Sequence, residues 1–126
     1  MKYLYFLIAS ILLLSACKER VSLNETDVTK YPWLKPFIHN NILDFEGEHD
    51  IDLGILYFSY KSSLMEENSF LFLDRVAHVN GWKLDQVTKI NREYSKHLHQ
   101  FEADTGKTII RIELDTLENR LRYEVD

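Results

Sequence analysis

Two segments near the carboxy end carry an apolar side chain at every second residue, and this alternation constrains the fold more than any other feature. The segments are residues 108–114 and 120–125. Successive side chains of a β-strand point to opposite faces, so each segment predicts a strand with one buried and one solvated face. Residues 115–119 between them suit a short hairpin loop. The expected buried phase is Ile110, Ile112, Leu114, Leu121, Tyr123 and Val125, and the solvated phase is Arg111, Glu113, Arg120, Arg122 and Glu124.

Residues 63–79 predict a helix with clear ends. Ser63 and Glu66 have the spacing of a capping box, in which the serine oxygen accepts from a backbone N–H of the first turn and the glutamate reaches back to the cap. Asn80 and Gly81 follow, and both residue types tolerate the left-handed conformation that ends many helices. The expected inward stripe is Phe70, Leu73, Val76 and Ala77, with Leu71 beside it.

Shorter patterns supply the remaining elements. Strands are predicted at residues 42–45, 51–60, 82–88 and 92–99, a turn at 47–50, a polar loop at 102–107, and an amphipathic turn or short helix at 31–39. Both phases of the 51–60 segment are apolar, so this strand is expected to be buried on both sides.

These segments predict an α+β fold in two layers. We expect a mostly antiparallel sheet of four to five strands in the order β-β-α-β-β-β, with one main helix on one face. One helix cannot cover both faces of such a sheet, so the second face is expected to be open to water. The capped helix disfavours an all-β sandwich.

The composition narrows the class of protein. The chain has 126 residues, which suits one domain, a formal net charge of −5 and a single cysteine. One cysteine excludes a disulfide scaffold, and the 45% of apolar residues excludes a fully disordered chain. The acidic balance disfavours nucleic-acid binding.

The amino terminus has the features of an export signal. Lys2 precedes an apolar run from Leu4 to Leu14, which is short for a permanent membrane-spanning helix. The run ends in Leu14-Ser15-Ala16-Cys17, and this sequence resembles the lipobox of bacterial lipoproteins. The alternatives are an uncleaved membrane anchor and a buried helix with an incidental cysteine.

The resemblance covers residues 1–17 and implies a lipid anchor. In this class the signal is cut before the cysteine, the thiol carries diacylglycerol, and the new amino terminus is usually acylated. The residue after Cys17 is Lys18 rather than aspartate, which implies the outer membrane, facing the periplasm, if the source is Gram-negative. Cleavage would remove Lys2 and change the net charge to −6. The expected organisation is a signal peptide at 1–16, a lipidated Cys17 with a polar tether at 17–30, and a domain at 31–126.

A metal site is one candidate for chemistry. His97 and His99 are two residues apart on a predicted strand, so both imidazoles could face one metal ion. A third ligand could come from His49, Asp50, Asp52 or Glu93. The simpler interpretation is that Tyr94 and Leu98 face inward and the two histidines are ordinary solvent-facing residues.

Acidic and aromatic side chains are candidates for partner binding. Asp44, Glu46, Glu48, Asp50 and Asp52 recur at every second position, which suits a solvated hairpin tip or contact with a basic partner. Among the aromatic residues, most are expected in the core, and Trp33 is a candidate anchor if it is exposed.

No motif for catalysis is found, so binding is the leading hypothesis. We expect a non-catalytic envelope lipoprotein without a cofactor, anchored in the membrane through Cys17, whose domain binds an envelope protein, with a basic protein as one candidate. The candidate contact residues are Trp33, Asp50, Asp52, Arg111 and Arg122. One alternative is an inhibitor or immunity protein against a basic envelope hydrolase or toxin. Another is a metal-binding protein or metal-dependent hydrolase that uses His97 and His99.

Overall fold

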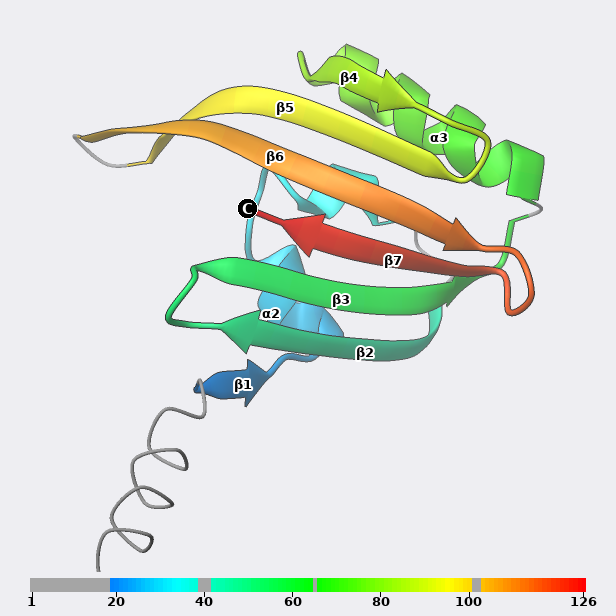
Figure 1. The fold of residues 1–126 in the computed structure, drawn as a ribbon, viewed down its shortest axis with the longest axis horizontal. Helices are drawn as coiled ribbons and strands as arrows, with labels where there is room; N and C mark the ends of the chain where they lie inside the picture. Colours follow the sequence, from blue (N-terminus) through cyan, green and yellow to red (C-terminus); the bar gives the residue numbers. More distant parts are fainter. Residues whose placement is uncertain (1–18, 39–41, 65, 101–102) are drawn as a thin grey trace, which may run out of the picture.

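The computed structural model describes residues 19–38, 42–64, 66–100 and 103–126. They form one seven-stranded antiparallel sheet with the strand order β1-β2-β3-β7-β6-β5-β4, together with three helical segments (Figure 1). The strands are β1 (Arg20–Ser22), β2 (Ile42–Asp50), β3 (Ile55–Ser62), β4 (Lys83–Val87), β5 (Asn91–Gln100), β6 (Ala103–Asp115) and β7 (Arg120–Val125). The helices are α2 (Glu25–Thr29), the 3-10 turn η1 (Lys35–Phe37) and α3 (Glu66–Val79).

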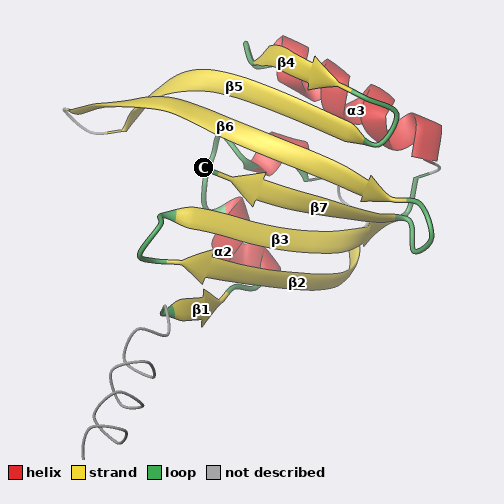
Figure 2. Ribbon diagram, viewed as in Figure 1, coloured by secondary structure: helices red, strands yellow, loops and turns green. Residues whose placement is uncertain are grey.

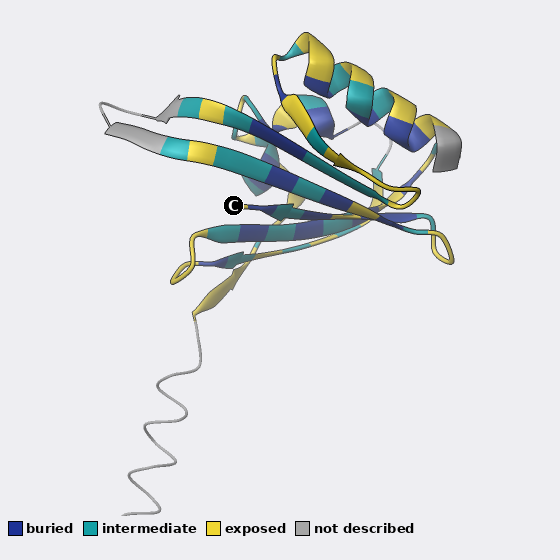
Figure 3. Cartoon of the chain, turned by 45° about the horizontal axis from the view of Figure 1, so that its top comes forward, coloured by how far each residue is buried: buried dark blue, intermediate teal, exposed yellow. Residues whose placement is uncertain are grey.

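The described helices lie on one face of the sheet, and none of them covers the other face (Figure 2). The core fills the space between sheet and helices, and buried residues alternate with less buried ones along β3, β6 and β7 (Figure 3). The predicted α+β class and the antiparallel sheet are confirmed. The predicted count of four to five strands is wrong: all six segments that the sequence predicts as strands contribute to the sheet as β2 to β7, and β1 adds a seventh strand at the edge beside β2.

The β6–β7 hairpin follows the alternation of the sequence. Asp115 pairs with Arg120 across a four-residue turn at 116–119. The six residues of the predicted inward phase are all buried. The prediction that Arg120 is solvated is wrong. Its side chain has the outward phase, but it is buried because its guanidinium folds over the sheet and binds Asp44 and Ser59.

Helix α3 ends where the sequence predicts. The backbone N–H of Trp82 donates to the Ala77 carbonyl, and Gly81 has a φ of 77°. The predicted inward stripe faces the core, whereas Leu71 is exposed, which corrects its expected place beside that stripe. The predicted capping box spans Met65, which lies outside the described residues, and it stays a prediction.

Strand β2 is longer than predicted, and the turn after it lies further along the chain. Residues 47–50 belong to β2, and the turn is formed by residues 51–54. The Asp50 carboxylate accepts a hydrogen bond from the Leu53 N–H, and Gly54 has a φ of 68°, so both ends of the turn are fixed locally. The prediction of a polar loop at 102–107 is also wrong, since β6 begins at Ala103.

The segment predicted as a polar tether is mostly folded. Strand β1 pairs with β2, and α2 follows it with a capping box between Asn24 and Asp27. Val28 on α2 is fully buried in the core. The folded domain therefore begins near Arg20 rather than at residue 31. None of the helices within the described ranges is long and apolar enough to span a lipid bilayer.

Candidate functional site

Two rows of polar side chains cross the open face of the sheet from β5 to β2. We call these ten residues the open charged face. Strand register aligns the first row as Glu93, Arg111, Glu124, Tyr57 and Glu48, and the second as Asn91, Glu113, Arg122, Ser59 and Glu46. Every member has the phase opposite to the core residues of its strand, so the same alternation that builds the core builds this face.

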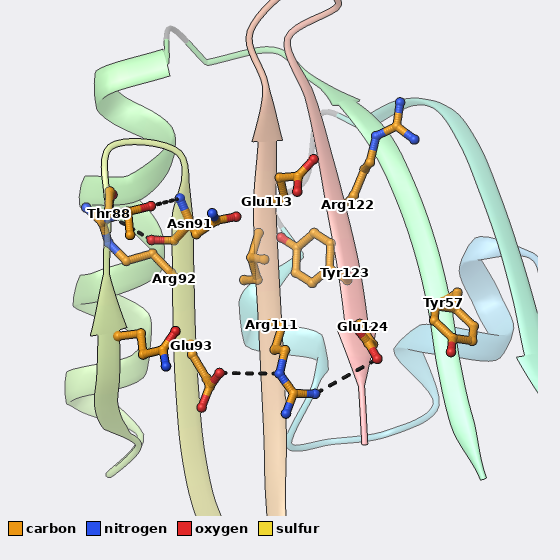
Figure 4. Close-up of a pocket in the computed structure, with 12 residues that line it drawn as sticks. Tyr57, Thr88, Asn91, Arg92, Glu93, Arg111, Glu113, Arg122, Tyr123 and Glu124 are labelled. Atoms are coloured by element: carbon orange, nitrogen blue, oxygen red, sulfur yellow. Dashed lines mark hydrogen bonds and ion pairs between the residues drawn. The ribbon is translucent and has the colours of Figure 1, made fainter. Parts of the chain in front are cut away.

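Arg111 lies at the centre of the first row and is shared by several carboxylates (Figure 4). Its Nε is 3.3 Å from Oε2 of Glu93, and its Nη1 is 3.9 Å from Oε1 of Glu124. A third carboxylate, that of Asp126, lies 4.0 Å from the same Nη1. The single positive charge of Arg111 is therefore surrounded by more than one negative charge.

The other arginines at this face are also paired. Nη2 of Arg122 is 3.1 Å from Oδ2 of Asp115. At the β1 edge, Nη1 of Arg20 is 3.1 Å from Oε2 of Glu48, and its guanidinium lies over the Tyr57 ring. Each of these arginines is thus neutralised from within the protein.

The pKa of the Asp115 carboxyl reflects the hydrogen bonds that this group accepts. Desolvation raises its pKa, but the hydrogen bonds from Arg122 and from the backbone N–H groups of Glu118 and Leu117 outweigh that effect. The net result is a pKa of Asp115 below its usual value. The charged form of Asp115 is therefore the form that the fold favours.

The open charged face carries an excess of negative charge. Its two rows contain five glutamates and two arginines, and Arg20 at the edge adds one more positive charge. Glu46 and Glu113 are exposed, and neither takes part in an ion pair between described residues. Two adjacent hollows of about 360 Å³ each lie on this face and share Tyr57 and Arg122. A partner with basic side chains could reach both glutamates there.

On the helix face, a second polar cluster fastens α3 to β5. The Tyr94 hydroxyl donates to Oδ1 of Asp74 at 2.6 Å, and Nε of Arg92 donates to the same carboxylate at 3.2 Å. The Arg92 guanidinium also lies 4.2 Å from the centre of the Phe70 ring. Burial and the neighbouring Asp74 raise the pKa of Tyr94 far above its usual value. These contacts satisfy each other, so we interpret the cluster as a structural brace.

The candidate residues from the sequence fall in different places. Arg111 and Arg122 share the open charged face. Trp33 is half-buried on the helix face, with its ring 5.4 Å from that of Tyr31 and 6.2 Å from that of Trp82. Asp50 is fully buried in the turn contact described above, which corrects its assignment as a surface binding residue, and Asp52 is exposed on the turn.

The histidine candidates are not brought together with further ligands in the described part of the chain. His97 is exposed on β5, and a bulge separates its pairing with Lys107 from the pairing of His99 with Asp104. The side chain of His99 lies outside the described part. Among the described residues, no group of three or more histidine, cysteine or acidic side chains could hold a metal ion. Cys17 and the rest of the segment that resembles a lipobox also lie outside the described residues.

Sequence reasoning did not identify the cross-strand rows. It placed Arg111 and Arg122 outward, but it assigned Glu46 and Glu48 to a hairpin tip and Glu93 to a possible metal site. The alternation in each strand shows which residues face outward. It does not show which strands are neighbours in the sheet, and the rows depend on that order. Comparison with known protein families, with curated proteins and with solved structures finds no match to this chain.

Proposed function

We propose that this protein is a lipid-anchored protein of the bacterial cell envelope whose domain binds a basic protein partner through the open charged face. The observation that carries the binding proposal is the pair of cross-strand rows, in which glutamates outnumber arginines on a face that no described helix covers. Complementary charge mainly raises the encounter rate and excludes wrong partners. The lipobox sequence at residues 14–17 supports the anchor.

The anchor is tested on Cys17. Cells that express the full chain are labelled with radioactive palmitate, beside a Cys17→Ser variant. We expect label in the parent protein only, and release of the variant from the membrane fraction. An unlabelled parent protein, with the variant fractionating as the parent does, would contradict the anchor.

The binding face is tested by charge reversal. The solubilised full-length protein is used to capture partners from envelope extracts at low and at high salt. Glu46→Lys and Glu113→Lys, each as a single variant, should reduce capture by about tenfold, which corresponds to about 1.4 kcal/mol. Glu25→Lys on α2 changes the same charge on the helix face and should leave capture unchanged. If all three variants capture as much partner as the parent protein does, or if capture is insensitive to salt, the open charged face is excluded as the binding surface.

The captured partner also separates the remaining alternatives. If it is a hydrolase or toxin, its activity is assayed with and without this protein, and inhibition would establish the inhibitor or immunity role. Zinc binding by equilibrium dialysis, compared with a His97→Ala, His99→Ala double variant, tests the metal-binding role. We expect no difference in zinc binding between parent and variant.

A further inference from the structure

We infer that the end of the sheet formed by β1 and the β2–β3 turn rests on the bilayer that carries the anchor. This inference rests on the lipid anchor of the proposed function and deepens it, because it fixes which side of the domain faces the membrane. The occupant of this surface is the headgroup layer of the anchoring membrane itself.

The distance between anchor and fold is short. Strand β1 begins at Arg20, three residues after Cys17. Three extended residues span at most about 11 Å, whereas each headgroup region of a bilayer is roughly 5–8 Å thick. The start of β1 therefore cannot move far from the membrane surface once Cys17 is acylated.

The β2–β3 turn is fixed to the same place. The Ile51 N–H donates to the Glu19 carbonyl at 3.3 Å, and Arg20 pairs with Asp50. The turn thus lies directly beside the chain segment that leads to Cys17. In Figure 1 the β2–β3 turn and β1 occupy the same end of the sheet, and the β6–β7 loop lies at the opposite end.

Exposed apolar side chains gather on these two elements. Val21 on β1 is 47% exposed, and Ile51 and Leu53 on the turn are 48% and 53% exposed. Leaving three such side chains in water costs free energy that contact with the membrane interface would recover. Asp52 lies between two of them and is exposed, so the turn is expected to reach the headgroups and not the acyl chains.

The aromatic side chains Tyr31 and Trp33 occur at the same end. They line a cavity of about 370 Å³ that also includes Gly54 of the turn. Tyrosine and tryptophan are the residues that favour membrane interfaces. The apolar turn, the short connection to Cys17 and these two rings therefore all point to one orientation.

The test compares the two ends of the sheet in the full acylated protein. Leu53→Cys and Leu117→Cys are labelled with an environment-sensitive maleimide dye and incorporated into vesicles of phosphatidylethanolamine and phosphatidylglycerol. The thioether at Cys17 does not react with the dye. Leu117 is 97% exposed on the β6–β7 loop and serves as the matched control.

We expect the dye at position 53 to shift its emission to the blue and to be quenched by nitroxide lipids, and the dye at position 117 to be quenched only by aqueous iodide. If both dyes respond only to iodide while mass spectrometry shows acylated Cys17, the orientation is wrong and the anchor stands. If Cys17 is found without lipid, the anchor and the orientation both fail.

Discussion

The Tyr123 hydroxyl donates a hydrogen bond of 2.9 Å to the backbone carbonyl of Phe37, and both residues are buried. The hydroxyl of Tyr60 lies within hydrogen-bond distance of the same carbonyl and of the Tyr123 oxygen. Strands β3 and β7 thereby hold the end of η1 against the sheet. The pKa of Tyr123 is raised by burial and by Tyr60, so this hydroxyl keeps its proton and remains a donor.

Removal of this hydroxyl should destabilise the domain. We expect Tyr123→Phe to lower the free energy of unfolding by about 1–3 kcal/mol, because the buried Tyr60 and Phe37 oxygens lose a partner. Tyr57→Phe, on the open charged face, should change it by less than about 0.5 kcal/mol. Urea unfolding followed by circular dichroism measures both, and equal losses would contradict the assigned role of Tyr123.

The polar cluster of Asp74, Arg92 and Tyr94 between α3 and β5 is expected to contribute to the free energy of unfolding as well. Asp74→Asn should destabilise by about 1–2 kcal/mol, since the side chain of Arg92 is only 13% exposed and would keep its charge with a neutral partner. Glu113→Gln, an exposed acid on the other face, is the matched control and should have little effect. If the two variants unfold at the same urea concentration, the brace contributes nothing measurable.

A side chain at Gly47 would crowd Leu23 on the neighbouring segment. A Cβ at this position would lie 3.2 Å from both the Cβ and the carbonyl oxygen of Leu23. Leu23 must stay close, because its N–H donates to the Gly47 carbonyl at 2.9 Å. We expect Gly47→Ala to loosen β1 from β2 and to speed hydrogen exchange at Leu23. A Cβ at Gly54 would meet no atom within 4 Å, but this residue has a φ of 68°. Gly54→Ala is therefore the comparison that shows the effect of backbone strain without a steric clash.

Asp115 predicts how stability changes with acidity. Its pKa is lower in the folded state than the usual value of 3.8, so it contributes stability above that value and loses it as the pH falls through the folded pKa. Unfolding of the parent and of Asp115→Asn should therefore differ at neutral pH and converge as the pH falls below about 4. A difference that is the same at neutral and at acid pH would contradict this assignment.

The parts of the fold that the sequence predicts well are those with strong periodicity. Alternation placed the inward residues of β6 and β7 correctly, and Asn80 with Gly81 marked the end of α3. These elements have one face in the core, so burial itself imposes the pattern that is read from the chain.

The missed elements lack such a pattern. All three residues of β1 are exposed, so its sequence shows no alternation, and it is a strand only because β2 provides a partner. Helix α2 buries a single residue, Val28, although the Asn24–Asp27 capping box was visible in the sequence. The β2–β3 turn was misplaced because the exposed Ile51 and Leu53 continue the alternation of β3 into the turn.

Only one aspect of the candidate site could be predicted from the sequence, namely the side of the sheet on which each residue lies. Strand phase gives the side on which Arg111 lies, but its partners Glu93 and Glu124 come from two other strands. Their proximity depends on register between segments that are far apart in the chain. No local pattern specifies that register, so the rows become visible only in the folded sheet.

Within the described part of the chain, strand β7 lies between β3 and β6 and joins the strands β1 to β3 to the strands β4 to β6. Tyr123 pairs with Phe58, so this junction closes a long loop of chain. Such non-local pairing is slow to form. Until residues 120–125 have been synthesised, the edges of β3 and β6 that pair with β7 have no partner strand, and unpaired strand edges favour aggregation.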